Sequence, residues 1–143
     1  MMQAGRYFVG DLCYVMHPEW NEVCDLFFEG RDDHGCNEGE FTLKDGRRFA
    51  AYNTMYGDGV YGSNRGTSHP VDAGLIGCIR VEDISEDVTE AHLLGYGAIM
   101  VFHEDFDTGT SPDGTIHFDT MEVYTGDVED EDEGIYLTSN CCL

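Results

Sequence analysis

The apolar residues of this chain come in short runs separated by glycine- and aspartate-rich turns, and only one stretch has helical spacing. Tyr7-Phe8-Val9 is such a run, too short for a helix and rich in aromatic and β-branched residues. Asp45-Gly46 supplies the positive φ angles of a tight turn, so residues 40–43 and 47–52 are predicted to pair as a β-hairpin. Short connections of this kind favour an antiparallel sheet over parallel crossovers.

Further strands are predicted wherever an apolar run recurs, for a total of six to eight. They are Leu12 to Met16, Val71 to Val81, Tyr96 to His103, Thr115 to Tyr124 and a short last strand at Ile135 to Leu137. Residues 56–66 are rich in Gly and Asn, which predicts either a long loop or short strands joined by tight turns. Residues 82–94 are predicted to hold one or two helical turns.

One stretch has the periodicity of an amphipathic helix. Its apolar stripe comprises Trp20, Val23, Cys24, Phe27 and Phe28. Pro18 suits an early helical position and Gly30 suits the end, so this helix is predicted to dock on a sheet. The predicted fold class is α+β, mainly antiparallel β: one compact sheet or a partly open barrel with one packed N-terminal helix. Residues 1–126 are expected to form a single globular domain, and residues 127–143 an acidic C-terminal extension.

Charge limits the kinds of partner that the chain can bind. It carries 29 acidic and 7 basic residues, a formal net charge of −22, and no Lys or Arg follows Arg80. Such a field repels nucleic acid and anionic membranes and attracts basic protein surfaces. The alternative interpretation is high solubility or adaptation to salt, with no basic partner.

Cysteines and apolar runs indicate the compartment. The six cysteines are irregularly spaced and form no C-x-x-C pair, so neither a disulfide framework nor a structural zinc site is predicted. No apolar run approaches the roughly 18–20 residues of a membrane span. The N-terminus lacks the apolar core of a signal peptide. The expected location is therefore the cytoplasm, that of the host cell if the protein is phage-encoded.

The segment from Tyr56 to Tyr61 (Tyr-Gly-Asp-Gly-Val-Tyr) is the most distinctive motif, and it is either a structural turn or a ligand contact. A ligand site there would use Tyr56, Asp58, Tyr61, Arg65 and Asp72. Asp72 is expected to be a buried carboxylate within an apolar strand, held by main-chain amides or by Arg65, with Asp11 in the same cluster.

Catalytic signatures are weak. A metal-assisted hydrolase would need Asp58, Asp72 and His103 to converge, and the sequence contains no G-x-S-x-G or H-E-x-x-H motif. No catalytic residue, metal site or cofactor is therefore predicted.

Three motifs together resemble a group of small proteins from bacteria and tailed phages. They are Tyr7-x-x-Gly-Asp-x-Cys-Tyr-Val15, Tyr56-Gly-Asp-Gly-x-Tyr61 and Val71-Asp-Ala-Gly-Leu-Ile-Gly77, and the resemblance spans about residues 6–125. It implies a phage or prophage setting and assigns no catalytic residue.

The functional hypothesis is a phage-type accessory protein that inhibits a host nucleic-acid-binding or defence complex, such as a nuclease or CRISPR effector, through an acidic surface that mimics nucleic acid. The partner-binding candidates form two acidic groups: Asp127, Glu129, Asp130, Glu131, Asp132 and Glu133, and Glu82, Asp83, Glu86 and Asp87. The alternatives are a small-ligand module that sequesters a host signalling molecule, built on Tyr56–Gly62, and the metal-assisted hydrolase. No direct contact with nucleic acid or membrane is expected, and self-association is left open.

Overall fold

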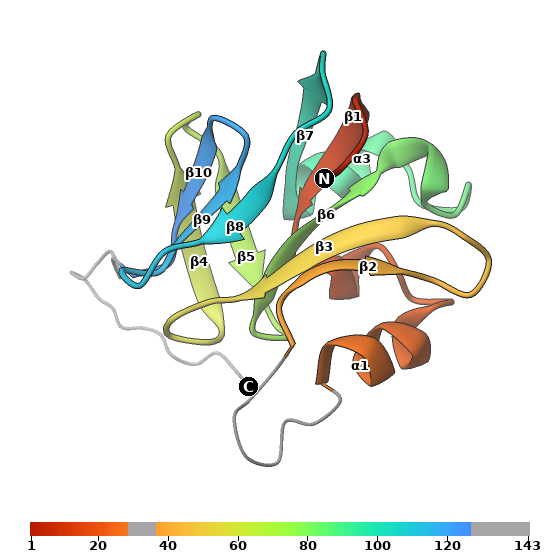
Figure 1. Cartoon of the computed structure of the whole chain (residues 1–143), viewed down its shortest axis with the longest axis horizontal. Coiled ribbons are helices and arrows are strands. Elements are labelled where there is room, and N and C mark those ends of the chain that lie inside the picture. Colours follow the sequence, from red (N-terminus) through yellow and green to blue (C-terminus); the bar gives the residue numbers. More distant parts are fainter. Residues whose placement is uncertain (29–36, 127–143) are drawn as a thin grey trace.

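Two open antiparallel sheets form the framework of the molecule. The computed structural model describes residues 1–28 and 37–126, in which ten strands and two α-helices are found. The predicted α+β, mainly antiparallel β class is confirmed, with the strands divided between two five-stranded sheets instead of gathered in one. Figure 1 shows the sheets side by side, with β3 and β8 meeting between them.

The first sheet has the strand order β2-β3-β6-β1-β7 and the second the order β5-β4-β10-β9-β8. The strands of the first sheet are β1 (Gly5–Gly10), β2 (Gly39–Thr42), β3 (Arg48–Asn53), β6 (Leu75–Arg80) and β7 (Gly97–Phe102). Those of the second are β4 (Gly59–Ser63), β5 (Ser68–Val71), β8 (Thr108–Thr110), β9 (Thr115–Phe118) and β10 (Met121–Tyr124). The helical elements are α1 (Trp20–Phe28), α3 (Glu90–Tyr96) and the 3-10 turns η1 (Leu12–Tyr14) and η2 (Val81–Asp83).

The first sheet is buried on both faces, which explains why its strands read as unbroken apolar runs. In β1, Tyr7 and Val9 point into a core shared with the second sheet, whereas Phe8 points into a core shared with the helices. In β6, Cys78 faces the first core and Ile79 the second. The molecule is thus layered as helices, sheet and sheet.

Helix α1 docks on the first sheet as its apolar stripe predicts. Val23 and Phe27 are fully buried in the helix-side core, and the ring of Phe27 lies edge-on to that of Phe41 at 6.2 Å between centroids. Figure 1 shows the helix beside β2 and β3. The predicted hairpin of residues 40–43 and 47–52 is also confirmed, with Thr42 paired to Arg48.

One predicted strand is wrong, and two others are each interrupted by a turn. Leu12 to Met16 begins with the 3-10 turn η1, since the Asp11 carboxylate accepts the N–H of Cys13 and bends the chain. Residues 71–81 divide into the end of β5, a turn and β6. Residues 115–124 form the β9–β10 hairpin, whose turn residue Asp119 has φ 58°; the alternation beyond Phe118 is that of a second strand.

One predicted close backbone approach is confirmed. A Cβ added at Gly77 would lie 2.0 Å from the main-chain oxygen of Ala50 in the neighbouring strand. Only glycine therefore fits at this position, where β6 lies beside β3. Within residues 1–28 and 37–126, no helix is both long enough and apolar enough to span a membrane.

Candidate functional site

Among the described residues, the buried carboxylate is that of Asp11, not Asp72. Asp11 is fully buried, and its Oδ1 accepts the N–H of Cys13 at 2.9 Å while its Oδ2 accepts the N–H groups of Asp72 and Ala73, both at 2.7 Å. Burial raises the pKa of the Asp11 carboxyl, and these N–H donors oppose the rise. Asp11 therefore ties the end of β1 to the turn between β5 and β6.

Asp72 is exposed, which corrects the expectation of a buried side chain. The predicted cluster with Asp11 does form, but through the main-chain N–H of Asp72. The Asp72 carboxylate lies close enough to Asp58 to raise the pKa of that group further, after the larger effect of desolvation. Among the described residues, however, no group of three or more His, Cys, Asp or Glu side chains is arranged to hold a metal ion.

The glycine-rich segment has the structural role of a turn. The Tyr61 side chain is buried, and its hydroxyl donates to the main-chain oxygen of Gly57 at 2.9 Å. The Thr54 hydroxyl donates to the same oxygen at 2.7 Å. Tyr56, by contrast, is 58% exposed. Tyr61 is directed inward, and its hydroxyl is hydrogen-bonded within the turn itself. Tyr61 is therefore not exposed to a ligand, although it is one of the five residues of the predicted ligand site.

The remaining members of the predicted ligand and metal sets lie elsewhere. Arg65 donates to the Thr120 hydroxyl and lines a hollow with His103 to which neither Asp58 nor Asp72 belongs. The structure thus brings together Asp11, Asp58 and the Asp72 turn, and it places Arg65 and His103 in a different hollow.

Three arginines line a hollow of about 390 Å³ near the N-terminus: Arg47, Arg48 and Arg80. Arg48 donates to the main-chain oxygen of Met1 and to Glu40, each at 2.8 Å. Arg80 donates to the main-chain oxygen of Ala4 at 2.7 Å. These guanidinium groups are already engaged by the chain itself, so the hollow is a poor anion site.

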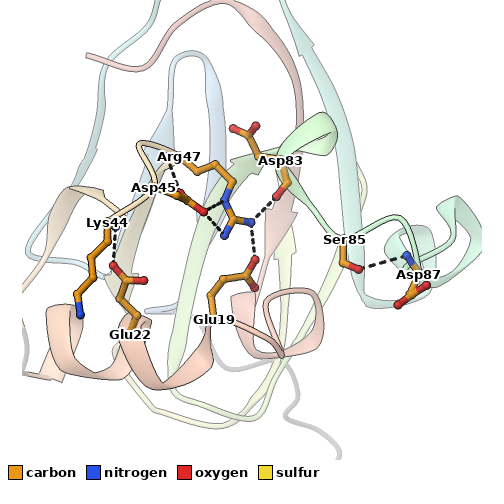
Figure 2. A network of polar contacts seen from close by, with 8 residues as sticks. All are labelled: Glu19, Glu22, Lys44, Asp45, Arg47, Asp83, Ser85 and Asp87. Carbon is orange, nitrogen blue, oxygen red and sulfur yellow. Dashed lines mark hydrogen bonds and ion pairs between the residues drawn. The ribbon is translucent and has the colours of Figure 1, made fainter.

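Arg47 joins three separate segments (Figure 2). Its guanidinium contacts the Glu19 carboxylate, pairs with Asp45 at 2.7 Å and donates to the main-chain oxygen of Asp83 at 3.0 Å. The hydrogen bond to Asp45 is the main cause that raises the pKa of Arg47, and Arg47 in turn lowers the pKa of Asp45. The network connects the β2–β3 hairpin to the start of α1 and to η2, which is a structural role.

A serine, a histidine and a glutamate lie one after another in space along a different hollow, which has a volume of about 450 Å³. Ser111 Oγ is 2.8 Å from His117 Nε2, and His117 Nδ1 is 3.7 Å from Glu122 Oε2. Acyl transfer also requires N–H donors directed at the substrate oxygen. The N–H of Ser111 donates to Thr115 and that of Gly114 donates back to Ser111, so the turn uses these donors. The contact between His117 and Glu122 follows from their pairing across β9 and β10.

A further acidic group gathers where β7 ends; Glu104 and Asp105 are adjacent in the sequence, and the tertiary structure adds Asp119. A hollow of about 450 Å³ there is lined by Glu104, Asp105 and Asp119, together with Arg65 and His103; we call it the acidic hollow. Asp105 lies in the connection between β7 and β8 and Asp119 in the turn of the β9–β10 hairpin, so their proximity is a property of the tertiary structure. No ion pair among the described residues involves these three carboxylates.

The predicted partner-binding residues fall into two sets. Glu82 lies 3.4 Å from Arg80, and both Glu86 and Asp87 are exposed. Asp83 contributes its main-chain oxygen to Arg47. Residues 127–133, with the six acidic side chains of the other predicted set, lie outside the described residues.

Comparison with protein-family models, curated proteins and solved structures gave no match. Function is therefore inferred from the charges, contacts and sequence motifs of this chain.

Proposed function

We propose that this protein binds the basic surface of a nucleic-acid-binding partner and thereby competes with nucleic acid for that surface. The observation that carries the proposal is the unequal use of charge in the described residues. Arg6, Arg47, Arg48 and Arg80 are each in an ion pair with a carboxylate of the same chain. The carboxylates of the acidic hollow are in no ion pair, although Asp105 accepts the main-chain N–H of Ala4 and Arg65 lines the same hollow. Glu104, Asp105 and Asp119 are exposed, so a negative excess faces solvent there.

The sign of the field selects the partner. At a formal net charge of −22, long-range attraction accelerates encounter with a positively charged groove and slows encounter with nucleic acid or an anionic membrane. A groove that binds a phosphate backbone is lined by Lys and Arg. In the phage setting that the sequence motifs imply, the first partners to test are host nucleases and CRISPR effectors, and the outcome would be inhibition.

The small-ligand alternative has less support. Of the five residues that it requires, Asp58 and Asp72 lie near each other, but the Tyr61 hydroxyl is buried in the turn, the Tyr56 ring is exposed and Arg65 lines the acidic hollow. In the hollow lined by Arg47, Arg48 and Arg80, each guanidinium group already binds groups of the chain itself.

The test is competition. A basic nuclease is loaded with labelled DNA, this protein is added at about 50 mM salt, and release of DNA is followed by fluorescence anisotropy. Because salt by itself weakens the binding of DNA to the nuclease, the salt dependence is measured on binding of this protein to the nuclease without DNA. That binding is expected at about 50 mM salt and is expected to weaken steeply at about 500 mM salt, because the Debye length falls from above 10 Å to below 5 Å. A variant with Glu86→Lys and Asp87→Lys tests the predicted patch, and one with Glu104→Lys and Asp119→Lys tests the acidic hollow.

A control is Asp25→Lys with Asn21→Lys, which raises the net charge by three, against four in each test variant, at exposed positions of α1. The proposal is overturned if binding of this protein to the nuclease does not depend on salt. It is also overturned if all three variants release DNA as well as the original protein does.

A further inference from the structure

An apolar groove separates the two sheets at their open edges. Strand β5 ends the second sheet, β7 ends the first, and the two approach each other. The groove holds about 530 Å³ and is lined by Val60, Thr67, Ser68, Pro70, Leu94, Gly95, Gly97, Ala98, Ile99 and Met100; none of these residues carries a charge. We call it the apolar groove.

The groove exposes large apolar side chains. Val60 is 61% and Leu94 56% exposed. Val101, which follows the groove residue Met100 in β7, is 55% exposed. A single exposed apolar residue is normal on a protein surface. Val60 in β4 and Leu94 in α3, however, line the same hollow. The groove is thus a surface where an apolar partner would displace water.

Although β5 lies near it, the edge of β7 that faces away from β1 is paired with no strand among the described residues. Its sequence, Gly-Ala-Ile-Met-Val-Phe, holds no charge and no proline, the usual means by which proteins protect a sheet edge. It pairs with β1 on one side only, so alternate residues direct their N–H and C=O groups away from β1. Its six residues present an edge of about 20 Å to an incoming segment.

Charge decides which segment fits this edge. The groove and the acidic hollow share Met100, so they are continuous along β7. A segment paired with β7 therefore passes from apolar walls to a hollow whose three carboxylates, Glu104, Asp105 and Asp119, outnumber the one guanidinium group, that of Arg65. A second copy of this chain would bring two bodies of net charge −22 together and is disfavoured at low salt.

We propose that the β7 edge and the apolar groove bind an extended, strand-like segment of a partner in which apolar side chains occur together with Lys or Arg. The inference rests on the proposed function, since it names the part of the basic partner that this chain holds. Main-chain pairing supplies affinity, the groove accepts the apolar side chains, and the acidic hollow accepts the cations. A segment of six residues alone gives a small, transient interface.

The test uses a synthetic, fluorescent peptide in which lysine and valine alternate over about the length of β7. Its affinity for the whole chain is measured by anisotropy at about 50 mM and about 500 mM salt. The variants are Val60→Asp and Leu94→Asp, and the control is Tyr56→Asp, another exposed position outside the groove. All three add the same negative charge, so attraction by charge alone predicts equal or slightly tighter binding.

If the peptide binds in the groove, its affinity is expected to fall, not rise, for two of the three variants. Val60→Asp and Leu94→Asp are expected to weaken peptide binding about tenfold, because a carboxylate replaces apolar contacts, whereas Tyr56→Asp does not weaken it. A peptide of equal charge with proline at alternate positions is expected to bind about tenfold more weakly, because it lacks the N–H groups of a strand. Hydrogen exchange of the β7 amides is expected to slow when the first peptide binds.

The outcomes separate the two proposals. Equal affinity for all three variants, or unchanged exchange in β7, overturns the β7 inference and leaves the basic-partner proposal standing. Absence of binding to both the peptide and the nuclease at low salt overturns the proposed function as well. Self-association that strengthens with salt and is abolished by Val60→Asp identifies a second copy as the occupant and overturns the peptide assignment. Urea unfolding of each variant verifies that these exposed substitutions leave the fold intact.

Discussion

The imidazole of His69 in β5 donates from Nδ1 to the main-chain oxygen of Val9 in β1, with 3.1 Å between the two atoms. Its Nε2 accepts from the Thr67 hydroxyl at 2.7 Å. Both ring nitrogens are thus used by the neutral form, and the histidine is fully buried. One side chain therefore joins the two sheets beside the apolar groove.

Acid is expected to weaken this connection. Burial lowers the pKa of His69 to about 4, below its value near 6.5 in the unfolded chain. The unfolded state then binds more protons than the folded state between pH 6.5 and pH 4, so the stability that His69 contributes is complete above pH 6.5 and is lost as the pH falls toward 4. The loss is about 3 kcal/mol.

The measurement compares urea unfolding of the original protein and His69→Gln between pH 7 and pH 4. Titration of the many carboxylates is common to both proteins, so the difference between their free energies of unfolding isolates the histidine. A difference that stays constant over this range would contradict the assignment.

Removing the Asp11 carboxylate is expected to destabilise the fold more than removing that of Asp72. Asp11→Ala leaves the N–H groups of Cys13, Asp72 and Ala73 without their acceptor, at an expected cost of about 2–4 kcal/mol. Asp72→Ala removes an exposed side chain and is expected to change the free energy of unfolding by about 0.5 kcal/mol or less. Equal values from chemical denaturation would show that Asp11 is not the anchor of this turn.

Arg47→Lys is expected to lower stability although the charge is kept. A lysine has one ammonium group, which does not reach Glu19, Asp45 and the Asp83 oxygen together as the guanidinium does. The expected loss is about 1 kcal/mol by thermal and urea unfolding. Arg6→Lys, at an exposed pair with Glu90, serves as the control and should leave the midpoint unchanged; a matching shift in both variants would refute the three-way connection.

Gly77→Ala is expected to disrupt the first sheet. The new Cβ would lie 2.0 Å from the Ala50 oxygen, and this contact is with backbone, so the strands must separate. The expected loss is about 3 kcal/mol or failure to fold. Gly62→Ala in β4 meets no atom within 4 Å and should be tolerated. Circular dichroism and urea unfolding of the two variants provide the comparison, and equal stability would exclude a close approach at Gly77.

The candidate sites show how far local patterns extend. The glycines around Asp58 do mark a tight turn, but the motif does not reveal that the Tyr61 hydroxyl is consumed within it. The Gly10-Asp11 pair indicates a cluster with Asp72, yet which carboxylate is buried depends on a contact between residues 61 positions apart. The acidic hollow was missed because Asp119 and Glu104 have no shared sequence pattern.

Spacing along the chain by itself determined the elements that are local: the amphipathic stripe from Trp20 to Phe28, the Asp45-Gly46 hairpin and the mainly antiparallel β class, because periodicity and turn geometry act between near neighbours. Composition likewise determined the negative field. Only the tertiary structure decided that the strands form two sheets, that Asp11 is the buried carboxylate and that β5 and β7 face each other across an apolar groove. These depend on which distant strands pair, and burial of both faces of one sheet is a property of the whole packed chain.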